Sequence, residues 1–240
     1  MAAPVALLAT LSAAGHAQGR ERLAVTFLSN GLTLTGCVVK PAGPGPFPAI
    51  IWNHGSEQNP PCGRRFVADV YVRQGYAVFF PIRHGHANSP GAYIGDLQRR
   101  AVQDFPKRED WNREMIRLHE LYNHDVVAAV NWFKQQPYVD STRMAMSGLS
   151  YGGIQTLLSA EQGLGLKAFV AFAPGAMSWD GNPALQLRLL KAVRAAPAPI
   201  FLLQARNDFS LGPSDLLGPA VREKGAPNEA KVYPEHGKTP

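Results

Sequence analysis

A serine between glycines is the residue whose type and spacing most clearly indicate chemistry. The stretch 148–153, Gly-Leu-Ser-Tyr-Gly-Gly, follows one short apolar run and precedes another, as a strand, a tight turn and a helix would. This is the setting of a G-x-S-x-G nucleophile elbow, whose serine lies on a strained turn with almost no room for neighbouring side chains. Gly148 and Gly152 meet that requirement and Gly153 leaves space for helix packing, so the pattern predicts Ser150 as a nucleophile. The alternative is a glycine-rich loop with an incidental serine, because the bare motif also occurs by chance.

A serine hydroxyl needs a base to remove its proton and a carboxylate to orient that base. In this architecture the acid and then the histidine follow the serine along the chain. Asp208 comes just after the apolar run 200–203, at the carboxyl end of a buried strand, where catalytic groups gather in open α/β sheets. His236 is the only histidine after Ser150, so it is predicted as the base. The alternatives are a loop Asp that caps the following helix and an exposed histidine in a terminal tail.

The negative charge that develops on the attacked carbonyl oxygen needs backbone donors that are already in place. The residue after the nucleophile normally supplies one donor, which here is the N–H of Tyr151. The loop after an early strand supplies the other, and the segment 53–56 follows the apolar run 49–52. We therefore predict an oxyanion hole formed by the N–H groups of Tyr151 and Ser56.

Short apolar runs alternate with amphipathic segments along the chain. The predicted strands are at 23–28, 32–39, 49–52, 76–80, 144–146, 166–172, 199–203 and 230–233, and the predicted helices are at 64–74, 114–136, after the elbow, around 184–193 and at 216–224. The polar stretch 83–111 is expected to be a loop inserted over a site. Such alternation predicts an α/β fold with a mostly parallel central sheet, helices on both faces and an antiparallel hairpin that turns at Asn30-Gly31.

Several of these motifs together resemble a known family. They are Asn-His-Gly-Ser at 53–56, Arg-His-Gly-His at 83–86, the elbow at 148–153, Asp208 and the pair Tyr233-Pro234. The chain resembles the α/β-hydrolase superfamily, and within it the dienelactone hydrolase family and the related catalytic domains of prolyl-oligopeptidase-type peptidases. The resemblance covers about residues 22–237 and implies an α/β-hydrolase fold with a Ser150–Asp208–His236 triad and no cofactor.

Two departures from the family pattern bear on function. Dienelactone hydrolases proper use a cysteine nucleophile, whereas Ser150 indicates general esterase chemistry. In the family the histidine also lies further beyond the Tyr-Pro tyrosine than His236 lies beyond Tyr233. The base is therefore left open between His236 and a histidine beyond Pro240, and the C-terminal end of the domain is expected to be incomplete in the second case.

Composition and motifs exclude several other classes of protein. The chain has 240 residues, 45% hydrophobic and 18% charged, which suits one globular domain with a sizeable core. The net charge is +6, but basic residues are interspersed with acidic ones, so no continuous basic stripe predicts nucleic-acid binding. The histidines at 84 and 86 lack a third ligand at useful spacing, so no metal is predicted. No phosphate-binding glycine motif predicts a nucleotide.

The N-terminus and the two cysteines concern the compartment in which the protein acts. Residues 5–11 are apolar and small residues follow, ending at Gly15-His16-Ala17, which resembles a cleavage site. We therefore interpret residues 1–17 as a secretory signal peptide and 18–240 as the hydrolase domain, exported to a bacterial periplasm or secreted. The protein would be cytoplasmic if this segment is not a signal peptide. Cys37 and Cys62 could pair or remain separate buried thiols, and the sequence leaves this open.

The sequence thus predicts a serine hydrolase that acts on an ester or related acyl bond of a small molecule, without membrane span, metal or cofactor. The alternatives are a peptidase or acyl-peptide hydrolase, and a non-catalytic or truncated hydrolase-like binding protein. Peptidases of this type usually carry a large accessory domain, for which 240 residues leave little room. Substrate identity and oligomeric state do not follow from the sequence.

Overall fold

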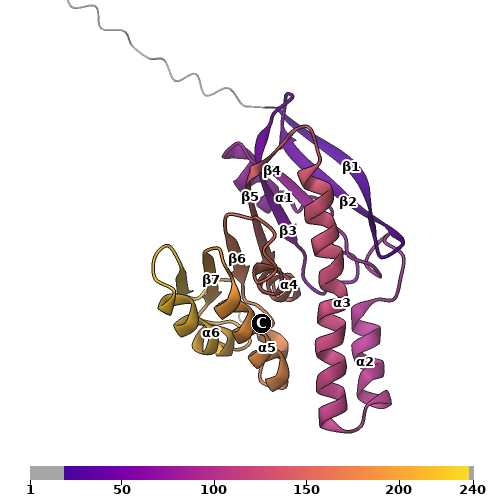
Figure 1. The fold of residues 1–240 in the computed structure, drawn as a ribbon, viewed down its shortest axis with the longest axis vertical. Helices are drawn as coiled ribbons and strands as arrows, with labels where there is room; N and C mark the ends of the chain where they lie inside the picture. Colours follow the sequence, from indigo (N-terminus) through magenta and orange to yellow (C-terminus); the bar gives the residue numbers. More distant parts are fainter. Residues whose placement is uncertain (1–18, 238–240) are drawn as a thin grey trace, which may run out of the picture.

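The structure is a computed structural model that describes residues 19–237, so the predicted signal peptide at 1–17 lies outside the described residues. One sheet organises the chain (Figure 1), with strand order β1-β2-β4-β3-β5-β6-β7-β8. The strands are β1 Arg20–Ser29, β2 Leu32–Pro41, β3 Phe47–Asn53, β4 Ala77–Pro81, β5 Val139–Leu149, β6 Phe169–Phe172, β7 Ile200–Ala205 and β8 Glu229–Tyr233. The helices are α1 Arg65–Arg73, α2 Ile94–Asp104, α3 Arg108–Lys134, α4 Tyr151–Ala160, α5 Pro183–Ala195 and α6 Gly212–Glu223, with a short 3₁₀ turn η1 at Ala176–Ser178.

The predicted fold class is confirmed. The strands from β3 to β8 pair in parallel with their neighbours, whereas β2 is antiparallel to both β1 and β4. The hairpin also turns where the sequence predicts, because Asn30 and Gly31 have φ angles of 47° and 78°. Positive φ at both central residues gives a turn whose twist matches that of the strands.

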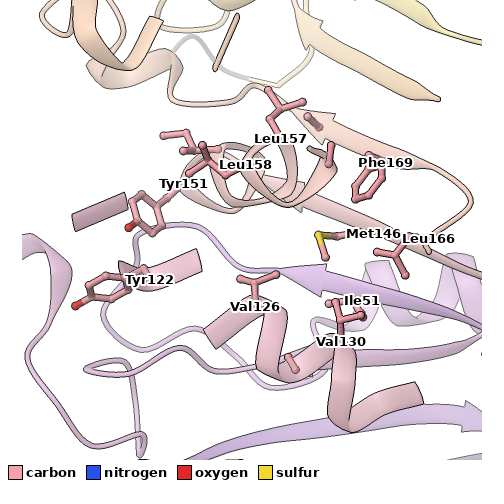
Figure 2. Packing of buried hydrophobic residues seen from close by; sticks show 14 of the residues in the cluster. Ile51, Tyr122, Val126, Val130, Met146, Tyr151, Leu157, Leu158, Leu166 and Phe169 are labelled. Atoms are coloured by element: carbon pink, nitrogen blue, oxygen red, sulfur yellow. The ribbon is translucent and has the colours of Figure 1, made fainter. Parts of the chain in front are cut away.

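The central strands are buried on both faces, which explains their uninterrupted apolar sequences. On β3, Ile50 and Trp52 pack toward α1, while Ala49 and Ile51 belong to the larger core on the opposite face. Figure 2 shows part of that larger core, where Ile51 of the sheet lies near Val126 and Val130 of α3. Helices therefore cover both faces of the sheet, as expected.

The prediction that residues 83–111 form a loop is wrong for a large part of the stretch. Residues 94–104 form α2, and α3 begins at Arg108 rather than at the predicted residue 114. The apolar side of α2 consists only of Ile94, Leu97 and Ala101, and polar or charged residues occupy most other positions. α2 packs beside α3 through this narrow stripe alone (Figure 1). Too few apolar residues therefore recur at helical spacing for the helix to be recognised from the sequence.

Cys37 and Cys62 form a disulfide, with Cα atoms 5.8 Å apart. Cys37 lies in β2 and Cys62 in the connection between β3 and α1, so the bond ties this connection to the strand next to the edge strand β1. The pairing that the sequence left open is thus present in the structure. Among residues 19–237, no helix combines the length and the apolar character needed to cross a membrane.

Candidate active site

The backbone of Ser150 has a conformation that L-amino acids rarely adopt, with φ 56° and ψ −116°. β5 ends at the residue before it and α4 begins at the residue after it. Such strain costs on the order of 1–3 kcal/mol and persists only where the surroundings determine the backbone. Here the Ser150 N–H donates to the Phe172 carbonyl of β6 at 2.9 Å, and the Ser150 carbonyl accepts from Ile154 at 3.1 Å and from Gly175 at 3.3 Å. The turn therefore has the geometry of a nucleophile elbow.

The three glycines around Ser150 are required by close backbone contacts. A methyl group on Gly148 would overlap the Gly152 carbonyl, and one on Gly152 would overlap the carbonyl oxygen of Asn53. A methyl group on Gly153 would lie 2.9 Å from the carbonyl oxygen of Phe172. The strand-to-helix turn can therefore approach the loop after β3 and the end of β6 only with glycine at these positions.

Asp208 and His236 line one cavity of about 380 Å³ at the carboxyl ends of β5 to β8. The cavity also contacts Leu149, the residue before Ser150. The Asp208 carboxylate accepts hydrogen bonds from the Gln204 side-chain amide at 2.8 Å and from the Phe209 N–H at 2.9 Å. These two donors fix the carboxylate at the rim of the cavity.

His236 is exposed, and its backbone rather than its ring is held by hydrogen bonds. Its N–H donates to the Asn207 side-chain oxygen at 3.0 Å, and its carbonyl accepts from the Asn207 side-chain nitrogen at 3.3 Å. Among the described residues, no hydrogen bond joins the side chains of Ser150, Asp208 and His236. The structure thus brings Asp208 and His236 to one cavity beside the elbow without forming the contacts of a closed triad.

The two predicted oxyanion donors lie on segments that contact each other. Tyr151 is the first residue of α4, where helix N–H groups have no partner within the helix and the helix dipole is positive. The loop that contains Ser56 packs against the same turn, since a methyl group at Gly152 would contact both the Asn53 and the His54 carbonyl oxygens. The donors predicted from the sequence therefore come from adjoining backbone segments.

A buried polar cluster beneath this loop was not assigned a role from the sequence. Arg83 is only 1% exposed, and it contacts His54 and the carbonyls of the loop. His86 lies against His54, and burial together with the Arg83 charge lowers its pKa to about 4. Burial, followed by the same charge, also lowers the pKa of His54 well below its usual value. Both histidines are therefore neutral at pH 7. The Arg-His-Gly-His motif at 83–86 was the signal for this cluster in the sequence. The motif alone did not show which groups these side chains contact, because the partners lie on the loop after β3.

His84, the remaining histidine of the Arg-His-Gly-His motif, pairs with Asp125 rather than with the loop after β3. Its Nδ1 lies 2.6 Å from a carboxylate oxygen of Asp125, whose other oxygen accepts from the Ser29 hydroxyl at 2.6 Å. Burial raises the pKa of Asp125, but its hydrogen bonds with His84 and Ser29 outweigh this and lower it overall. This pair connects the hairpin turn, the segment after β4 and α3. Within residues 19–237, no group of three or more His, Cys, Asp or Glu is placed to hold a metal ion.

A second cavity, of about 570 Å³, lies between α2, the start of α3 and the segment 177–182. His119 of α3 lines it, and its ring centroid lies 5.3 Å from that of Tyr151, which follows Ser150. The His119 Nδ1 atom is buried without a hydrogen-bond partner in the described part of the chain. Burial lowers the pKa of His119 to about 4. This cavity was not predicted, because it depends on α2, which the sequence did not reveal.

Residues 34–238 match the model of the dienelactone hydrolase family. The chain belongs to this family. Dipeptidyl-peptidase 5 of Porphyromonas gingivalis is 25% identical over 222 residues, which cover 79% of this chain and 30% of the relative. The chain thus spans about 30% of that relative's length.

Two solved structures share the fold of this dienelactone hydrolase family member. Dienelactone hydrolase from Anabaena variabilis is 18% identical with a TM-score of 0.64, covering 90% of this chain and 86% of that one. Acetyl xylan esterase from Paenibacillus sp. R4 is 15% identical with a TM-score of 0.68, covering 91% of this chain and 80% of that one. At these identities the likeness shows the fold alone. The match to the family model confirms the family membership that the resemblance of the motifs implied.

We expect Gly152→Ala to reduce the free energy of unfolding by about 3 kcal/mol, because the added methyl group must displace the Asn53 carbonyl. Urea denaturation measures the change. Gly218→Ala in α6 is the matched control, because its added methyl group would meet mainly the flexible end of Arg222 and should leave stability unchanged or raised. Equal stability of the Gly152→Ala variant and the wild type would show that the turn and the loop do not need this contact.

Stability should also depend on pH through His119. In the unfolded chain His119 takes up a proton near its ordinary pKa of 6.5, whereas in the folded protein it stays neutral down to about pH 4. The unfolded state therefore binds more protons between these values, and His119 alone should cost about 2 kcal/mol of stability on going from pH 8 to pH 5.

Urea denaturation at both pH values tests this expectation. His119→Phe should lose less stability between pH 8 and pH 5 than the wild type, by about the amount assigned to His119. His124→Gln, at an exposed position of the same helix, should keep the full loss. The same loss in the His119→Phe variant as in the wild type would contradict the assignment.

Proposed function

We propose that this chain is a serine hydrolase that cleaves an ester or related acyl bond of a small molecule through an acyl-enzyme. The observation that carries the proposal is the strained backbone of Ser150 between β5 and α4. Backbone strain of on the order of 1–3 kcal/mol clusters at active sites, where it is part of the mechanism. The loop at 53–56 lies against the same turn, and an oxyanion hole needs a second backbone donor close to the nucleophile.

In the proposed reaction, the Ser150 hydroxyl oxygen attacks the substrate carbonyl carbon and its proton passes to His236. The N–H groups of Tyr151 and Ser56 stabilise the oxyanion. Collapse of the tetrahedral intermediate breaks the bond to the leaving group, which takes the proton from His236. Water then repeats the sequence on the acyl-enzyme, releasing the acid and restoring Ser150. Asp208 orients the imidazole and stabilises its protonated form.

Two contacts support His236 and Asp208 in these roles. Both residues line the cavity next to Leu149. Asn207, the residue before Asp208, holds the backbone of His236 by two hydrogen bonds. The segments that carry Asp208 and His236 are therefore tied together beside this cavity.

The peptidase alternative is favoured by one observation, the similarity to dipeptidyl-peptidase 5 over most of this chain. The esterase proposal has a fold in common with an acetyl xylan esterase over most of both chains, so the fold itself is compatible with ester cleavage. The elbow serves either bond, because both substrates pass through the same tetrahedral intermediate. Substrates that differ only in this bond therefore distinguish the two readings.

A panel of variants tests the proposal with a fluorophosphonate probe, p-nitrophenyl acetate and dipeptide p-nitroanilides. We expect wild type to be labelled and to hydrolyse the ester faster than the anilides. Ser150→Ala and His236→Ala should each lower kcat/KM by about 10⁴-fold, because removal of either partner disables the unit. His124→Ala, which removes an exposed histidine of α3, should retain wild-type activity.

Each outcome of this panel has a defined reading. Equal labelling of wild type and Ser150→Ala would exclude Ser150 as the nucleophile. An unlabelled wild type would favour the non-catalytic alternative, and faster cleavage of the anilides would favour the peptidase. Full activity of His236→Ala would transfer the base to another histidine.

We also propose that residues 1–17 are a signal peptide and that the protein acts outside the cytoplasm. The Cys37–Cys62 disulfide supports this, because such bonds persist mainly in oxidising compartments. Mass spectrometry of protein from the native host should find a mature chain that begins at Gln18. A cytoplasmic chain that retains residues 1–17 would contradict this localisation.

A further inference from the structure

Arg83 holds the loop that would supply one oxyanion donor. Its side-chain nitrogen Nη2 donates to the carbonyl oxygens of His54 at 2.8 Å and of Gly55 at 2.7 Å. Arg83 follows β4, which lies next to β3 in the sheet, so it reaches the loop after β3 directly. Two consecutive peptide groups of the loop are therefore held by one guanidinium group.

The next two carbonyls of the loop are also held by the segment after β4. The Tyr93 hydroxyl donates to the Ser56 carbonyl at 2.6 Å. The His86 Nδ1 atom lies 2.9 Å from the Glu57 carbonyl oxygen and can donate to it as a neutral imidazole. All four carbonyls from residue 54 to residue 57 thus have side-chain partners within residues 83–93.

The direction of these carbonyls determines the direction of the N–H groups. In a planar trans peptide, the carbonyl and the following N–H point in opposite directions. The Gly55–Ser56 peptide is trans, and its carbonyl points at Arg83. The Ser56 N–H must therefore point away from Arg83. The guanidinium group thus sets the orientation of the donor that the proposed reaction needs.

Arg83 also contacts the segment that carries the other donor. Its guanidinium carbon lies 5.0 Å from the centroid of the Tyr151 ring, within the range of a cation–π interaction. Loop and elbow therefore share one rigid neighbour. A change at Arg83 would affect the spacing of the two donors as well as the direction of one.

The charge of Arg83 is unusual for a merely structural residue. Burial lowers its pKa to about 10, so it remains positively charged at pH 7. In the part of the chain that the structure describes, it forms no ion pair, and its Nε and Nη1 atoms have no hydrogen-bond partner. A buried cation without a carboxylate reduces stability. A negative charge that develops nearby during the reaction would interact favourably with it.

We propose that Arg83 is a positioning residue of the oxyanion hole, which orients the Ser56 N–H through the Gly55 carbonyl and couples that loop to Tyr151. This inference rests on the proposed function. A structural role alone predicts lower stability with unchanged catalysis per folded molecule. A positioning role predicts a loss that is specific to the transition state and to compounds that mimic it.

The test compares wild type, Arg83→Met and Arg83→Lys with p-nitrophenyl acetate and an aryl trifluoromethyl ketone, which forms a tetrahedral adduct with an oxyanion. In Arg83→Met, kcat should fall by about 10²-fold or more, with KM within about 3-fold of wild type, because loss of one oxyanion donor has this effect. The inhibition constant of the ketone should rise in parallel with the fall in kcat. Arg83→Lys should recover part of both losses, since an ammonium group still donates to a carbonyl.

Arg188→Met is the matched control. Arg188 is mostly buried between Glu120 and Glu161, where it links α3, α4 and α5. Its replacement should lower the thermal midpoint without changing kcat or the inhibition constant of the folded protein. Circular dichroism and active-site titration correct every rate for the folded fraction.

Unchanged kcat and unchanged ketone affinity in folded Arg83→Met would overturn the positioning role. If Arg83→Met does not fold, kcat and the inhibition constant of the ketone are compared in Arg83→Lys. Wild-type values of both in that variant would overturn the positioning role. Ser150→Ala is assayed alongside. An inactive Ser150→Ala beside a fully active Arg83 variant would reject only the role of Arg83, whereas an active Ser150→Ala would reject the proposed function and this inference together.

Discussion

The strained backbone at Ser150 is the constraint on which the rest of the site depends. A residue at φ 56° and ψ −116° stays there only if its neighbours leave no alternative. Three hydrogen bonds provide that restraint, one from the Ser150 N–H to the Phe172 carbonyl and two to the Ser150 carbonyl from Ile154 and Gly175. Glycines at the closest approaches of the backbone add to it. The parallel sheet is what makes these restraints possible, because β5 and β6 end side by side and α4 begins directly above them.

The same constraint explains the contact between the turn and the loop after β3. Without a side chain at Gly152, the carbonyls of Asn53 and His54 can lie against the first turn of α4. The buried carbonyls of His54 and Gly55 need donors, and Arg83 supplies them. His86 and Tyr93, from the same segment after β4, contact the carbonyls of Glu57 and Ser56. The buried arginine and the loop after β3 are therefore two parts of one arrangement.

Family membership and bond specificity come from different parts of the molecule. The sheet, the elbow and the strand-end Asp208 are shared features of a hydrolase fold, and they agree with the match over residues 34–238. The two cavities are formed instead by the β7 and β8 ends on one side and by α2, α3 and the segment after β6 on the other. Relatives with the same sheet can therefore include both peptidases and esterases.

Local patterns in the sequence determined the features that depend on neighbours along the chain. The Asn30-Gly31 turn, the alternation of strands and helices, and the glycines around Ser150 were predictable because backbone conformation and hydrophobic period are local properties. Asp208 was predictable as a strand-end residue for the same reason. The narrow apolar stripe of α2 was not, since a helix that packs mainly on one neighbour leaves little periodic signal.

Only the tertiary structure decided which distant groups meet. The Cys37–Cys62 bond, the contact of His119 with Tyr151 and the hydrogen bonds from Arg83 to the loop at 54–55 join residues far apart in the chain. Such pairings depend on strand order and on how closely segments approach, and no spacing in the sequence encodes these. The nucleophile elbow could thus be predicted from local sterics, whereas the groups that hold and orient its surroundings became visible only when the sheet brought β3 and β4 side by side.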